Sequence, residues 1–144
     1  MNNFPHILIC LLRGVAIGQI AVAILNLFLV RLMKWESDLG RMPLLVREVF
    51  QVHAWFISVT LAIFGTLTWR FAGEMAAGSN PIGQWLCAGI GLFWAIRTVL
   101  QVTYYSSSHW KGRFDRTAMH FLLLFAYGGL ALLYLYVGFG GRSL

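Results

Sequence analysis

Seven of the polar side chains within or beside the apolar stretches of this sequence are of types that bind cofactors or anions. Arginine carries a permanent charge and a planar fork of N–H donors that fits carboxylates and phosphates. Neutral imidazole is a common iron ligand, and its ring nitrogens also donate or accept hydrogen bonds. Glutamine and tyrosine can orient a ligand through further hydrogen bonds. The seven residues are His53, Arg97, Gln101, Tyr104, Arg116, His120 and Tyr127.

The spacing of these residues predicts two polar helix faces, because residues three, four or seven apart lie on one side of a helix. The first face carries Arg97, Gln101 and Tyr104. The second face carries Arg116, His120, Tyr127 and Tyr134. His53 belongs to a separate stretch, and its predicted depth matches that of Gln101 and His120. We therefore expect one polar pocket toward the cytoplasm, since polar groups in membrane helices usually face the interior.

Two histidines on different helices at one depth predict a redox cofactor. In a b-type haem site, His53 and His120 would be the axial metal ligands. Arg97, Arg116 or Arg47 would pair with the propionates through charge-assisted hydrogen bonds. A quinone site would need fewer protein groups, because one histidine or tyrosine that hydrogen-bonds to a quinone carbonyl is enough. The sequence has no Cys-x-x-Cys-His, so covalent attachment of haem is excluded.

The same residues allow other functions, and the sequence does not decide whether the chain is an enzyme. Arg97 could reach the interface as a purely structural group, and the histidines could be packed. The chain would then be an accessory subunit of a larger membrane complex. It could instead bind or transport a small anionic or lipid-like molecule through Arg97. A membrane-embedded lipid-modifying enzyme, with His53 or His120 as the acid–base group, is a further alternative.

Long apolar blocks must position these residues. The chain has 144 residues, of which 59% are hydrophobic and 11% charged, and its mean hydropathy is +0.72. A membrane-spanning helix needs about 20 apolar residues, and an isolated span must be helical to satisfy its backbone. The blocks 7–33, 49–69, 82–105 and 117–139 fit that length. We predict an all-α integral membrane protein, with residues 1–144 forming a single domain that is a bundle of four transmembrane helices.

The basic residues predict the orientation of the chain and explain its net charge of +6. Four of them lie between the first two blocks: Arg31, Lys34, Arg41 and Arg47. Three more lie between the last two blocks: Lys111, Arg113 and Arg116. Cytoplasmic loops are rich in Lys and Arg. Both basic loops are thus expected in the cytoplasm and both termini outside, in the inner membrane if the source is bacterial. The expected partners are the lipid bilayer and either further copies or a larger membrane complex, not nucleic acid.

Smaller features complete the prediction. Tyr134 and Tyr136 are expected in the outer aromatic belt, and Pro43 in the first turn of the second span. Glycines are expected where helices approach closely or where space is left beside a planar ligand: Gly14, Gly18, Gly89, Gly91, Gly128 and Gly129. Cys10 and Cys87 lie inside predicted spans, which argues against a disulfide framework.

Overall fold

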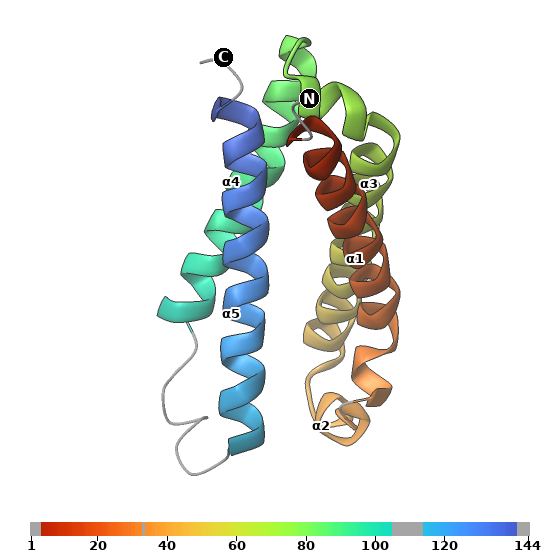
Figure 1. Cartoon of the computed structure of the whole chain (residues 1–144). Coiled ribbons are helices and arrows are strands. Elements are labelled where there is room, and N and C mark those ends of the chain that lie inside the picture. The colour runs from red at the N-terminus through yellow and green to blue at the C-terminus, as the bar shows by residue number, and fades with distance from the viewer. Residues whose placement is uncertain (1–3, 33, 105–113, 141–144) are drawn as a thin grey trace. The chain divides into compact units, whose positions relative to one another are not determined.

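The computed structural model describes residues 4–32, 34–104 and 114–140, which are helical apart from short turns (Figure 1). The elements are α1 (Phe4–Leu32), α2 (Glu36–Gly40), α3 (Leu44–Ala77), α4 (Pro81–Thr103), α5 (Phe114–Leu135) and a π-helical turn, η2 (Tyr136–Gly140). In the described part, four helical stretches are long and apolar enough to cross a membrane: 4–32, 44–77, 81–103 and 120–140. The prediction of an all-α chain with four membrane-spanning helices is confirmed.

Helix α3 is longer than the predicted span, because hydropathy marks the membrane core and not the end of the helix. Residues 49–69 carry no Asp, Glu, Lys or Arg, and their length of about 31 Å matches the roughly 30 Å hydrocarbon core. The helix continues to Ala77 through residues that favour helix. Gly78 then ends it with φ at 61°, and its N–H donates to the carbonyl of Glu74 at 3.2 Å.

The connection from α3 to α4 is three residues long, Gly78 to Asn80. The Asn80 side chain accepts a hydrogen bond from the Ile82 N–H at 2.9 Å, and Pro81 occupies the first turn. Pro43 lies directly before Leu44, the first residue of α3. Its carbonyl oxygen accepts a hydrogen bond from the Arg47 N–H at 3.1 Å. Pro43 therefore precedes the helix that it was expected to begin.

The chain divides into two compact units, residues 1–72 and 73–144. In the first unit, α1 runs antiparallel beside α3 (Figure 1). Toward one end, the Asn26 amide donates to the Ala54 carbonyl at 2.8 Å and to the Ser58 hydroxyl at 2.9 Å. Toward the other end, the Arg13 guanidinium lies 5.6 Å from the centre of the Trp69 ring. These contacts fix the register of the pair, because they are far apart along both helices.

In the second unit, α4 and α5 run antiparallel and continue in contact through η2 (Figure 1). A Cβ at Gly91 would lie 2.9 Å from the Leu135 nitrogen, and one at Gly138 would lie 2.9 Å from the Ala88 nitrogen. Both glycines therefore allow backbones to meet. Tyr134, expected in an aromatic belt, is instead completely buried. This expectation was wrong because position 134 lies on the packed face of α5, whereas Tyr136 is 52% exposed.

The glycines of α1 do not behave as predicted. A Cβ at Gly14 or Gly18 would meet nothing within 4 Å, so no described atom packs closely against them. In the first unit the close approach is at Gly65, where a Cβ would lie 2.8 Å from the Ala16 carbonyl oxygen. The expectation failed because the Gly-x-x-x-Gly spacing is common in membrane helices and does not by itself select the packed face.

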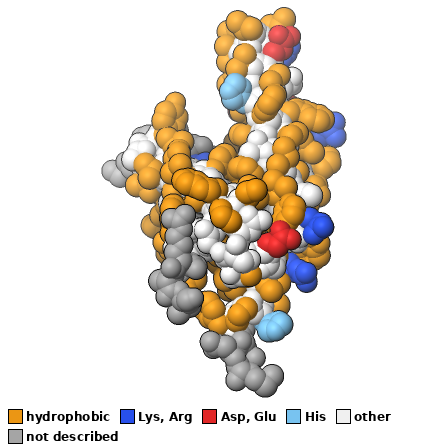
Figure 2. All heavy atoms as spheres, turned by 90° about the horizontal axis from the view of Figure 1, so that it is seen from above, with side chains coloured by type: hydrophobic (Ala, Val, Ile, Leu, Met, Phe, Trp, Pro, Cys, Tyr) orange, Lys and Arg blue, Asp and Glu red, His pale blue; other side chains and the backbone are white. Residues whose placement is uncertain are grey.

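Apolar side chains predominate on the face of the molecule shown in Figure 2, and charged side chains are few there. Large apolar residues are exposed along α1 and α3, including Ile17, Phe28, Trp55 and Phe56. A water-soluble protein rarely exposes so much contiguous apolar surface. The surface therefore fits a hydrocarbon environment and supports integration into the membrane.

Candidate functional site

A side-chain hydrogen bond within α4 joins Arg97 and Gln101. Arg97 Nη1 donates to Gln101 Oε1 at 2.9 Å, as their spacing of four residues allows. Gln101 is 3% exposed, so its amide is removed from solvent on the packed side of α4. Arg97 is half-buried. The sequence predicted that Arg97 and Gln101 share one helix face, and in the structure a hydrogen bond joins them directly.

Gln101 also reaches across to α5, and this contact has a defined direction. Gln101 Nε2 lies 3.1 Å from His120 Nδ1. A guanidinium can only donate, so the amide oxygen must face Arg97 and the amide nitrogen must face the imidazole. The amide nitrogen is also only a donor. His120 Nδ1 therefore accepts, which places the ring proton of a neutral His120 on Nε2.

Aromatic rings extend this contact on the other side of Arg97. The Arg97 guanidinium carbon lies 4.8 Å from the centre of the Tyr127 ring on α5, within the range of a cation–π interaction. Trp94 of α4 stacks on Tyr127, with ring centres 5.2 Å apart and planes inclined by 23°. The sequence interpretation missed Trp94. Its spacing of three and seven residues from Arg97 and Gln101 was the signal that could have found it.

Together these five residues form a continuous row, which we call the polar ladder: Trp94, Tyr127, Arg97, Gln101 and His120. The row takes three residues from α4 and two from α5, so it depends on the register of that helix pair. Arg97 lies about 9 Å before the end of α4, and His120 begins the apolar stretch of α5. The His120 end of the polar ladder thus lies near one end of these two spans, and Trp94 and Tyr127 lie further in.

Trp94 contributes a buried N–H to this region. The side chain is 3% exposed, and its Nε1 has no hydrogen-bond partner among the described atoms. An unpaired buried donor costs free energy, on the order of 1–3 kcal/mol. The stacking on Tyr127 and an edge-to-face contact with Phe93, at 5.5 Å between centres, contribute on the favourable side.

The other predicted site residues lie elsewhere or beyond the described part. Tyr104 caps the end of α4 and is 82% exposed. The side chain of Arg116 lies outside the residues that the structure describes. His53 belongs to the other unit and is exposed on α3, where its Nδ1 lies 2.9 Å from the Val49 carbonyl oxygen. The structure therefore brings together Arg97, Gln101, His120 and Tyr127.

The two histidine rings differ in which nitrogen carries the proton, and this decides which nitrogen could bind a metal. His53 Nδ1 must donate to a carbonyl, so Nε2 of the neutral ring carries the lone pair that ligation requires. In His120 the Nε2 atom carries the proton instead, as the bond from Gln101 dictates. Within the described residues, no group of three His, Cys, Asp or Glu side chains could hold a metal ion. The geometry of His120 favours hydrogen bonding over ligation.

In the neutral tautomer that Gln101 selects, the His120 proton is on Nε2, and the Arg97 charge is held on the far side of Gln101. His120 is half-buried, and its ring lies edge-on to Phe121 with 5.8 Å between the centres. Phe121 is itself 51% exposed. A donor beside an exposed aromatic ring suits a planar ligand with a carbonyl acceptor.

In comparisons with family models, curated proteins and solved structures, the chain finds no match.

Proposed function

We propose that this chain binds the head group of a quinone at the His120 end of the polar ladder and serves as a redox-associated membrane subunit. The observation that carries the proposal is the fixed direction of hydrogen bonding from Arg97 through Gln101 to His120. It assigns a proton to His120 Nε2. A quinone is uncharged, planar and apolar apart from its carbonyl oxygens, each of which accepts a hydrogen bond from such a donor.

The surroundings of His120 support a quinone over a charged ligand. Arg97 already contacts an amide oxygen and the face of Tyr127, two groups that stabilise a cation. At the His120 end of the polar ladder, Phe121 and Phe125 expose aromatic surface on α5. A quinone ring could stack there, and its hydrocarbon tail could follow the helix into the membrane.

Haem b is the second form of the proposal, and a specific observation separates it from the first. His53 has the tautomer of an axial ligand, because its Nδ1 donates to the Val49 carbonyl. His120 would have to move its proton to Nδ1, which would set it against the Gln101 amide nitrogen. Ligation by both histidines therefore requires the polar ladder to rearrange, whereas quinone binding uses it as it stands.

The cofactor can be tested by gentle detergent purification followed by solvent extraction and mass spectrometry. We expect about one quinone per chain in the wild type and about tenfold less in His120→Phe, the loss expected from one hydrogen bond. His120→Gln keeps an N–H donor and should retain part of the quinone. His53→Phe is the matched control and should bind as the wild type does.

Two outcomes would remove the quinone proposal. One is quinone retention in His120→Phe equal to that of the wild type. The other is the absence of quinone from wild-type protein to which ubiquinone and menaquinone analogues have been added. A Soret band that disappears in both histidine variants would replace quinone with haem. Native mass spectrometry of the same sample would report the number of copies and any companion subunits.

We also propose that both basic loops face the cytoplasm, which puts the polar ladder on that side. The arginines and lysines between α1 and α3 and before α5 support this orientation. In a chain with Cys10→Ser and Cys87→Ser, we expect a membrane-impermeant maleimide to label Ser79→Cys from outside intact cells. It should not label Asp38→Cys. The reverse pattern would overturn the orientation.

A further inference from the structure

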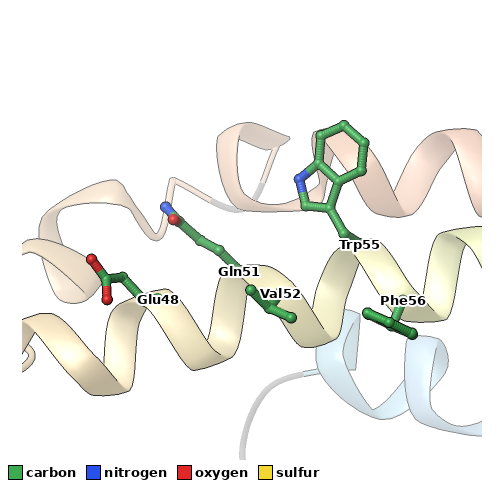
Figure 3. A pocket seen from close by; sticks show the side chains of 5 residues that line it. All are labelled: Glu48, Gln51, Val52, Trp55 and Phe56. Carbon is green, nitrogen blue, oxygen red and sulfur yellow. The ribbon is translucent and has the colours of Figure 1, made fainter.

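Helix α3 carries a hollow that the polar ladder does not involve (Figure 3). Its volume is about 500 Å³, and it is lined by Glu48, Gln51, Val52, Trp55 and Phe56. The spacing of three, four, seven and eight residues from Glu48 places all of them on one side of the helix. Each is exposed. The hollow is therefore a surface feature of the first unit, formed by a single helix.

The lining changes from polar to apolar along the helix. Glu48 is the last charged residue before the uncharged stretch 49–69, so it marks the boundary of the membrane core. Trp55 lies two turns, or about 10 Å, further in. Figure 3 shows Glu48 at one end of the hollow, Trp55 and Phe56 at the other, and Gln51 and Val52 between them. An amphiphile lying along α3 would meet these groups in that order.

The polar groups of the hollow are unoccupied by other parts of the described protein. No described side chain forms an ion pair or a hydrogen bond with Glu48 or Gln51. Glu48 is thus a carboxylate without an ion-pair partner among the described residues, at the boundary of the uncharged stretch and next to Arg47 in the sequence. A cation is its natural partner there, because charge-assisted hydrogen bonds are stronger than neutral ones.

We propose that this hollow binds one phospholipid with a primary-amine head group, of the phosphatidylethanolamine type. The ammonium donates to the Glu48 carboxylate. The phosphate and ester oxygens, which come next in the lipid, accept from the Gln51 amide and the Trp55 indole N–H. One acyl chain follows Val52 and Phe56 into the membrane. The order of groups in the lipid is the order of side chains along α3.

The chemistry also selects among lipids. A choline head group has no N–H to donate to a carboxylate and is best held against an aromatic face. Trp55 lies two turns deeper than Glu48, too far along the helix to face the ammonium. An anionic lipid such as phosphatidylglycerol has no ammonium to pair with Glu48, and its attraction to the basic residues before α3 would not involve that carboxylate. The hollow should therefore prefer ethanolamine over both.

Native mass spectrometry tests the preference directly. The purified wild type is exposed to an equimolar mixture of ethanolamine, choline and glycerol phospholipids with identical acyl chains, and the adducts are compared. We expect the ethanolamine lipid to exceed the choline lipid by about threefold or more, and Glu48→Gln to bring the ratio close to one. Glu74→Gln changes an exposed glutamate near the other end of α3 and should leave the ratio unchanged.

Three results would overturn the proposal. They are a wild-type ratio close to one, a preference for the glycerol lipid, and a preference for ethanolamine that survives in Glu48→Gln. If the Glu48→Gln protein does not fold, Gln51→Leu takes its place, with a fall of about threefold in total phospholipid adducts expected. In either case, the ratio of ethanolamine to choline lipid adducts on the wild type decides whether the proposal stands. Because the hollow and the polar ladder lie in different units, these results are independent of quinone binding.

Discussion

The hydrogen bond between Gln101 and His120 makes a quantitative prediction about stability. His120→Phe removes the acceptor of an amide that is 3% exposed. The amide is left buried and unpaired, at a cost of about 1 kcal/mol. Gln101→Leu removes this bond and also the bond from Arg97, for a total of about 1–2 kcal/mol after allowance for the weak average of hydrogen bonds in membranes.

The double variant should cost less than the sum of the single variants. Once Gln101 is leucine, no amide remains to be left unpaired, so phenylalanine at position 120 adds little. We expect a coupling energy of about 1 kcal/mol between the two positions. The measurement is reversible unfolding of the wild type and three variants in mixed micelles of rising dodecyl sulfate content, followed by circular dichroism.

Additivity would refute the reasoning. If the double variant equals the sum of the single variants to within about 0.4 kcal/mol, the two side chains do not share a hydrogen bond. Gln84→Leu supplies the control, because Gln84 donates to the Gly78 carbonyl at 2.7 Å and lies about 25 Å from Gln101 along α4. Its combination with His120→Phe should be additive.

Three further predictions follow from the packing. Gly138→Ala should destabilise the protein by about 1–3 kcal/mol, because its Cβ would meet the α4 backbone at 2.9 Å; Gly89→Ala, with nothing within 4 Å, should not destabilise it in the same unfolding titration. Asn26→Leu should cost about 1 kcal/mol, since two hydrogen bonds to α3 are lost, and a neutral result in that titration would contradict them. N-ethylmaleimide should reach buried Cys87 only after denaturation, as read by intact mass; equal labelling of Cys87 before denaturation would show that α4 is not packed there.

The number and nature of the spans could be predicted from the sequence because both depend on local composition. An uncharged stretch of about 20 residues predicts a helix in the membrane wherever it occurs. The end of α3 could not be predicted in this way. Its last turns leave the hydrocarbon core, and there helix propensity and the left-handed Gly78 decide the boundary instead of hydropathy.

In the candidate site, only the contacts within one helix could be predicted from the sequence. The four-residue interval between Arg97 and Gln101 implies their contact whatever surrounds them. The positions of His120 and Tyr127 beside them depend on how α4 and α5 are aligned, and close approaches at Gly91 and Gly138 set that alignment. The same register buries Tyr134, which composition alone assigned to the membrane interface. Side-chain types therefore identified candidates, and helix packing selected among them.

The three-residue turn after Gly78 has a consequence for biogenesis. So short a connection requires the end of α3 and the start of α4 to be on the same side of the bilayer. In the orientation proposed above, this turn is the part of the helical hairpin that must cross the membrane. Arg70 and Glu74 give it one charge of each sign, so its translocation would carry no net charge. The basic segments before α3 and α5 would then stay on the side from which the hairpin enters.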